Sequence, residues 1–121
     1  MEIDRNSQSI ILESRAHYAV VLSALTHGLS LARFNPEVHD HLKDQGVANA
    51  REIRNGMLSV SKPELPFVLP YDAAKTAVAG IRSANFGSTR ETTQTFKVKI
   101  VRKRIGEELR GAFLDLNNDT V

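Results

Sequence analysis

Five basic side chains gather within ten residues near the end of the chain, Thr95–Arg104, and none of the ten is acidic. These five cations are Lys97, Lys99, Arg102, Lys103 and Arg104. The chain has 16 Lys and Arg in all, so 11 remain elsewhere against 14 Asp and Glu. Concentrated positive charge binds polyanions, because neutralised phosphates release their condensed counterions. The segment therefore predicts contact with nucleic acid or with a nucleoprotein complex, chiefly through phosphates.

A solvated strand is the alternative interpretation of this segment. Lysines on the outer face of an edge strand discourage pairing with other chains. Glu107, Glu108 and Asp115 follow closely enough in the sequence to offset part of the charge. Phe96 is the single aromatic residue within the segment, which argues against a platform on which single-stranded bases stack.

Residues 36–60 have the layout of a helix-turn-helix, with a short helix, Gly46 in a turn and a second helix beginning near Asn49. In that hypothesis four side chains reach bases or phosphates, namely Asn49, Arg51, Arg54 and Asn55. However, polar His41 stands where the first helix should pack, and Glu52 stands where an apolar residue is needed. An ordinary helical hairpin fits the pattern better.

Metal and catalytic chemistry have little support. On a helix, residues two apart point about 200° away from each other, so His39 and His41 are poorly placed to share an ion. The chain has no cysteine, which excludes disulfides, cysteine–zinc sites, Fe–S clusters and thiol catalysis. The motifs of common hydrolases, nucleotide-binding loops and zinc proteases are absent from the sequence. We expect a non-enzymatic protein without metal or cofactor, and an enzyme subunit with a site built by tertiary structure is the weakest hypothesis.

The longest predicted helix covers residues 9–34, with Ser7 or Ser9 capping its first turn. Apolar residues recur along it at spacings of three, four and seven, which places them on one face. The members of this stripe are Ile11, Tyr18, Leu22, Leu25 and Leu29, with Ala32 continuing it. The stripe predicts either a core face or a seam for a homodimer or another protein partner.

Three further elements follow before the polar part of the chain. A second helix over 36–45 starts with an asparagine cap and a proline, and ends at Gly46. A third helix over 49–60 is predicted, with a turn at Asn55 and Gly56 as the alternative. Residues 62–71 contain three prolines, which favours an extended crossing over the core. The helix predicted over 73–85 carries small residues that permit close packing against another helix.

The last third of the chain changes character. Residues 86–94 are predicted to be a polar loop. Apolar residues then alternate with lysines over 95–100, which is the period of a half-buried strand. The spacing over 101–116 fits a helix, but two glycines weaken it and a lone strand needs a partner for its backbone groups. A basic hairpin over 95–116 is therefore favoured, followed by a frayed tail at 117–121.

Length and composition bound the fold class. At 121 residues, with 41% apolar and 25% charged residues, the chain fits one ordinary globular domain. It has no apolar run near 18 residues, and its first residues are acidic and polar, unlike a secretory signal. We therefore predict a cytoplasmic α+β protein without a membrane partner. A single domain over 1–121 is expected, with about four helices mainly within 7–85 and a C-terminal basic strand or hairpin.

Two functional hypotheses follow from these patterns. The first is a small non-enzymatic binding protein that contacts nucleic acid or a nucleoprotein complex through the basic C-terminal segment. The second is a protein-interaction module, such as a small inhibitor or adaptor of viral or plasmid type, that blocks a partner protein's site. Steep salt dependence of binding would distinguish the first from the second.

Overall fold

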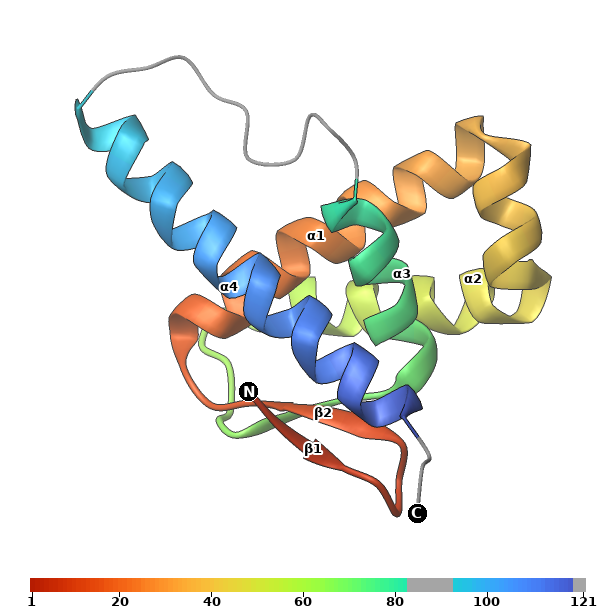
Figure 1. Ribbon diagram of the computed structural model, residues 1–121, viewed down its shortest axis with the longest axis horizontal. Helices are drawn as coiled ribbons and strands as arrows, with labels where there is room; N and C mark the ends of the chain where they lie inside the picture. The colour runs from red at the N-terminus through yellow and green to blue at the C-terminus, as the bar shows by residue number, and fades with distance from the viewer. Residues whose placement is uncertain (83–92, 119–121) are drawn as a thin grey trace.

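The computed structural model describes residues 1–82 and 93–118, although the side chains of 93–99 lie outside the description. This part of the chain forms four helices and a three-stranded antiparallel sheet, so the fold is α+β and mostly helical. The small sheet lies at one end of the helices (Figure 1). Within the described ranges, every helix falls short of the length and apolar character needed to cross a membrane.

The described chain begins with a β-hairpin. Strand β1 (Glu2–Asp4) pairs antiparallel with β2 (Ser9–Leu12). The Asp4 carboxylate holds the turn by accepting hydrogen bonds from the backbone N–H groups of Asn6 at 3.0 Å and Ser7 at 3.4 Å. Hydrogen bonds to this carboxylate, above all from the Ser7 side chain, lower the pKa of Asp4 because they favour its charged form.

The first helix, α1 (Arg15–Phe34), starts later than predicted. Its cap is Ser14 and not an earlier serine, because the Ser14 hydroxyl accepts a hydrogen bond from the His17 backbone N–H at 3.1 Å. The residues assigned to its first turns form β2 instead. Ile10 and Leu12 are fully buried there, and a strand places such alternate side chains on the same face. The prediction of a continuous helix from residue 9 is therefore wrong.

Helix α3 (Tyr71–Ile81) packs against α1 with the two backbones almost in contact. A Cβ atom on Gly28 of α1 would lie 2.0 Å from the carbonyl oxygen of Thr76. Likewise, a Cβ atom on Gly80 of α3 would lie 2.1 Å from the carbonyl oxygen of Ala24. The small residues of this segment do permit close helix packing, as predicted.

Helix α2 (Pro36–Leu58) begins as predicted but is broken at a different place. The Asn35 side chain caps it by accepting a hydrogen bond from the Glu37 N–H at 3.0 Å. The break is at Lys43, whose φ of 68° and ψ of 161° are not helical. The predicted end at Gly46 is thus wrong, and the chain is helical again through the glycine.

Two side chains from other helices satisfy carbonyl groups that α2 leaves without helical donors. The Lys75 ammonium of α3 donates to the His41 carbonyl at 3.0 Å, next to the break. The Tyr18 hydroxyl of α1 donates to the Met57 carbonyl at 2.9 Å, in the last turn. Because the last carbonyls of a helical segment lack intrahelical donors, these bonds fasten the end of each segment of α2, the one before Lys43 and the one after it, to the core.

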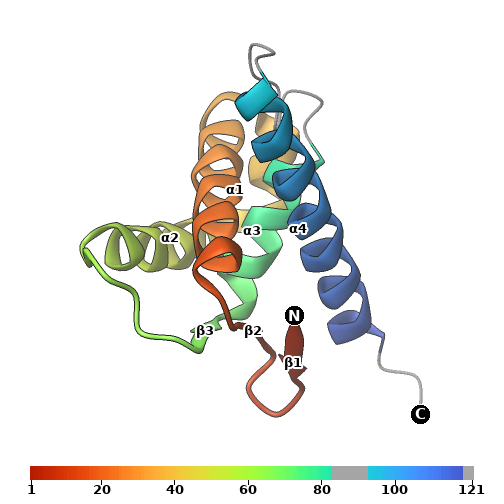
Figure 2. The same ribbon diagram turned by 90° about the vertical axis from the view of Figure 1, so that its left-hand side faces the viewer.

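The proline-rich segment crosses the core in an extended conformation, as predicted. Within it, β3 (Phe67–Leu69) pairs antiparallel with β2, so that Val68 stands opposite Ile11. The Phe67 ring meets Tyr18 of α1 edge to face, with centroids 5.3 Å apart and an interplanar angle of 87°. The sheet is thereby attached to the first turn of α1 (Figure 2).

The predicted C-terminal strand or hairpin is wrong, because Thr93–Asn117 forms a single helix, α4. The helical alternative over 101–116 is the one that the structure shows. A helix satisfies its backbone groups within itself, so no partner strand is required. Side chains spaced three and four residues apart become buried along one face, and they are Ile105, Leu109, Ala112 and Leu116.

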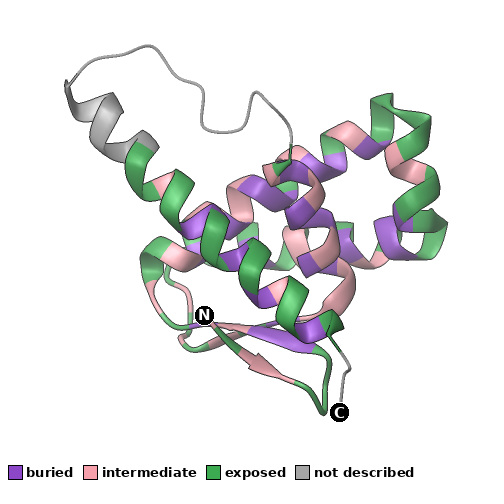
Figure 3. Ribbon diagram, in the orientation of Figure 1, coloured by how far each residue is buried: buried purple, intermediate pink, exposed green. Residues whose placement is uncertain are grey.

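Some predicted elements fall on residues outside the description. The polar loop at 86–94 lies there except for Thr93 and Gln94, which open α4. The tail at 117–121 lies there from residue 119 onward, and Asn117 is the last residue of α4. Among the described residues, buried apolar side chains of all four helices, β2 and β3 form one core cluster. Figure 3 marks the buried positions on each element.

Candidate nucleic-acid interface

All five cations predicted to contact nucleic acid lie on α4, and not on a strand. Lys103 and Arg104 are exposed and Arg102 is half-buried. Lys97 and Lys99 belong to the same helix, but their side chains lie outside the description. Positions 97 and 104 are separated by roughly 10 Å along a helix axis. The charge is therefore carried on about two helical turns.

The basic part of α4 precedes the part that joins the core. Ile105 is the first of the buried core residues on the described part of the helix, and Leu109 is 0% exposed. Just before them, Ile100 and Val101 are 42% and 45% exposed. Figure 3 shows this change from exposed to buried positions along the helix. The two apolar side chains thus lie at the surface among the cations, which the sequence alone did not indicate.

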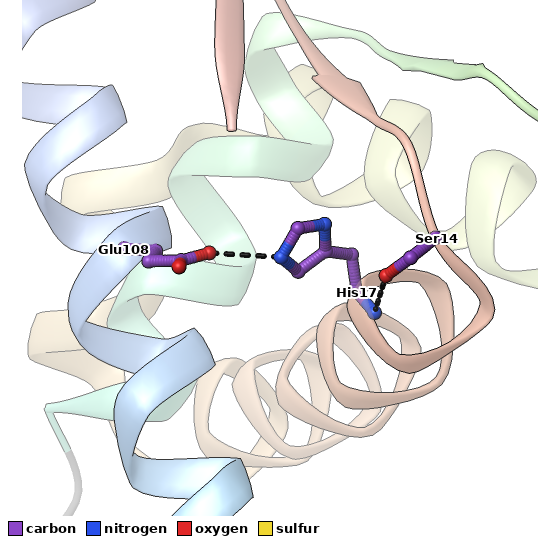
Figure 4. A network of polar contacts seen from close by, with 3 residues as sticks. All are labelled: Ser14, His17 and Glu108. Carbon is purple, nitrogen blue, oxygen red and sulfur yellow. Dashed lines mark hydrogen bonds and ion pairs between the residues drawn. The ribbon is translucent and has the colours of Figure 1, made fainter.

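Two carboxylates follow the cations on α4, and they have different surroundings. Glu107 is exposed, one helical turn beyond Lys103. Glu108 forms an ion pair with His17 of α1, with 2.8 Å between Oε2 and Nε2 (Figure 4). The Glu108 carboxylate is therefore directed toward α1. Glu107 is the acid that most directly reduces the positive charge at the surface of the basic part of α4.

Ser14, His17 and Glu108 lie near one another without forming a catalytic triad (Figure 4). The Ser14 hydroxyl accepts from the backbone N–H of His17, not from its imidazole. The His17 Nδ1 atom is buried, and no described residue forms a hydrogen bond with it. A serine nucleophile requires a hydroxyl hydrogen-bonded to the imidazole. Here Ser14 caps α1, and the contact between His17 and Glu108 connects α1 with α4. The sequence did not predict the contact between His17 and Glu108, because the two residues lie far apart along the chain.

The four residues of the helix-turn-helix hypothesis do not form a surface that could contact DNA bases. The break at Lys43 is a single non-helical residue, whereas that motif needs a turn of about three or four residues. Asn49 donates a hydrogen bond to Asp72 of α3 at 2.7 Å. Arg54 donates to its neighbour Asn55 at 3.1 Å. Arg51, the remaining member of the set, is exposed.

The predicted interface stripe lies mostly in the core of the chain itself. Tyr18, Leu25 and Leu29 are 6%, 0% and 6% exposed, and Leu22 is half-buried. Ile11 is half-buried on β2, outside the helix on which it was placed. Tyr18, Leu25 and Leu29 therefore belong to the core of the chain itself, and Leu22 packs against that core.

His39 and His41, which are two residues apart, have different surroundings. His39 contacts Asp44 across the break in α2, with 2.9 Å between Nε2 and Oδ1, and His41 is exposed. Across residues 1–82 and 93–118, no group of three or more His, Cys, Asp or Glu side chains is arranged to hold a metal ion.

Comparison with known proteins adds no functional information. No protein-family model, curated protein or solved structure matches this chain. Function must therefore be argued from the arrangement of the chain's own residues.

Proposed function

We propose that this is a small non-enzymatic binding protein that contacts nucleic acid, or a nucleoprotein complex, through the basic part of α4. The observation that supports the proposal is the concentration of charge between Lys97 and Arg104, which holds five cations and no acid. Lys103 and Arg104 are exposed there, before the helix joins the core. Such charge attracts phosphates because binding releases the counterions condensed on them.

The shape of the element suits a duplex. An α-helix with its side chains is about 10–12 Å wide, and the major groove of B-form DNA is about 12 Å wide. Arginine contacts phosphate in a bidentate manner, and lysine acts as a point charge. Residues 97–104 contain no Asn or Gln, the side chains that read adenine most directly. We therefore expect backbone contacts with little sequence preference.

The test is the salt dependence of binding to fluorescent duplex DNA, duplex RNA and single-stranded oligonucleotides. If all five cations contact phosphate on B-form DNA, log Kobs should fall against log salt concentration with a slope of about −4.5. A fourfold rise in salt then weakens binding about 500-fold. Failure to bind every one of these nucleic acids at low salt would contradict the proposal.

A matched pair of double variants tests whether binding depends on the cations of α4 or only on the net charge of the protein. Lys103→Gln/Arg104→Gln should reduce the magnitude of the slope by about 1.8, to about −2.7. Arg51→Gln/Lys62→Gln removes the same charge from exposed positions outside α4 and should leave the slope near its original value. Equal losses in both variants would assign the binding to net charge instead of α4.

A protein partner is the second candidate, and the exposure of Ile100 and Val101 favours it. Apolar side chains at a surface contribute more to protein interfaces than to phosphate contacts. In this hypothesis the module acts as an inhibitor or adaptor and uses the same part of α4. Binding to one stoichiometric protein that is weakened by Ile100→Ser, but changes little between low and moderate salt, would support it over the first proposal.

A further inference from the structure

A cleft of about 490 Å³ lies beside α3, between the first segment of α2 and the end of α4. Its volume is within the range of about 300–1,000 Å³ that small-molecule sites occupy. Along α3 its lining runs from Tyr71 to Arg82, the residue that follows the helix, over about three helical turns. Among the described residues of the basic part of α4, none lines the cleft, which is in this respect separate from the surface proposed above.

One part of the cleft is apolar and aromatic. The rings of Tyr71 on α3 and Phe113 on α4 lie with centroids 5.3 Å apart, at an angle of 35°. Val78 and Ala79 extend this lining along α3. These side chains offer a surface on which an apolar or aromatic body can pack.

The polar groups at the aromatic part already bond to one another. The Tyr71 hydroxyl donates to the Asn117 side-chain oxygen at 2.7 Å. The Asn117 amide in turn donates to the Phe113 carbonyl at 2.8 Å. A ligand is therefore not needed to satisfy these groups, and they hold the rings in place.

The cationic groups of the cleft retain donors that a ligand can use. The Lys75 ammonium donates one of its hydrogen bonds to the His41 carbonyl, and an ammonium has three N–H donors. Arg82 is exposed, and the described residues give its guanidinium no partner. Glu37 is the one acid among the described lining residues, where it is outnumbered by Lys75 and Arg82. This balance favours an anion.

We propose that this cleft binds a small organic anion, with its apolar or aromatic body against Tyr71 and Phe113 and its single acidic group held by Lys75 and Arg82. Carboxylates, sulfonates and phosphate monoesters share the required chemistry, because each presents several oxygen acceptors to Lys and Arg. The apolar body distinguishes these ligands from inorganic anions.

The test is a fluorescence titration of the full chain with 8-anilinonaphthalene-1-sulfonate, an aromatic monosulfonate. Wild type should show one saturable site. Arg82→Gln should weaken binding about tenfold, since it removes a charge-assisted hydrogen bond. Ala79→Phe should abolish binding, because it fills the cleft without changing the charge. Arg51→Gln removes an exposed charge elsewhere and should leave binding unchanged.

Competition identifies the part of the probe that the cleft recognises. Octanoate should displace the probe, whereas inorganic phosphate at the same concentration should not. The proposal is overturned if binding does not saturate, if Arg82→Gln binds as wild type does, or if phosphate competes as well as octanoate. Arg82 lies at the surface, so its variant remains decisive even if Ala79→Phe does not fold. An equal loss in Lys103→Gln/Arg104→Gln would place the probe on α4 and also refute the cleft.

Discussion

Replacing Gly28 with alanine should push α1 and α3 apart, because the new Cβ atom has no room. It would lie 2.0 Å from the Thr76 carbonyl oxygen and 2.9 Å from the carbonyl carbon. A carbon atom normally approaches a carbonyl oxygen no closer than about 3.3 Å. The obstacle is backbone, which cannot rotate aside as a side chain can, so the helices must separate by about 1 Å or more.

The expected cost follows from two opposing effects. Overpacking a close contact costs about 1–3 kcal/mol and occasionally more, and the upper end applies because both elements are rigid. Alanine gains about 1 kcal/mol over glycine in a helix. We therefore expect the free energy of unfolding of Gly28→Ala to fall by about 2 kcal/mol.

A second glycine provides the matched control. Gly111 lies within α4, and no atom of the described part of the chain comes within 4 Å of a Cβ atom built on it. Gly111→Ala should therefore raise the free energy of unfolding by about 0.5–1 kcal/mol. Urea unfolding followed by circular dichroism measures both variants. If Gly28→Ala were as stable as Gly111→Ala, the close contact between α1 and α3 would be refuted.

Three other substitutions test individual side chains. Lys75→Met removes the ammonium that caps the break in α2 and should lower the free energy of unfolding in urea by about 1 kcal/mol. Tyr18→Phe leaves the buried Met57 carbonyl without its donor and should cost about 1–3 kcal/mol. Burial raises the pKa of Tyr18, so stability should also decline as the pH rises past the ordinary tyrosine pKa of about 10, and less so in the phenylalanine variant. Glu107→Gln removes an acid beside Lys103 and should tighten oligonucleotide binding about twofold at low salt, as an anisotropy titration would report.

Local signals predicted the elements whose causes are local. The start of α2 follows from an asparagine cap before Pro36, and the structure shows that cap. Prolines around Phe67 exclude a helix, and that segment is extended. In each case a neighbouring residue restricts the backbone directly, so a single sequence contains the necessary information.

The errors arose where a distant partner decides between two patterns. Ile11 stands seven residues before Tyr18, which suits a helix, yet β2 forms because β1 and the remote β3 pair with it. Apolar residues alternate up to Ile100, which suits a strand, yet the helical spacing from Ile105 onward packs on the core and the whole segment is helical. Short apolar runs fit either period.

The features of the candidate site also fall into two groups, those visible in the sequence and those that depend on packing. The cations up to Arg104 were found from composition, because charge is visible in a sequence. Exposure of Ile100 and the pairing of Glu108 with His17 depend on how α4 packs. The cleft at Arg82 joins α2, α3 and α4, and no local pattern reports such a junction.

The close contact between α1 and α3 also bears on the order of folding. These helices are separated in the chain by all of α2 and β3, so their contact requires closure of a long loop. Helices α1 and α2 are joined through Asn35 alone and can pair while the chain is still open elsewhere. We expect α3 to dock afterwards, which places the two glycines outside the folding nucleus. Their fit then governs how long the native state persists, through the unfolding rate, more than how quickly it forms.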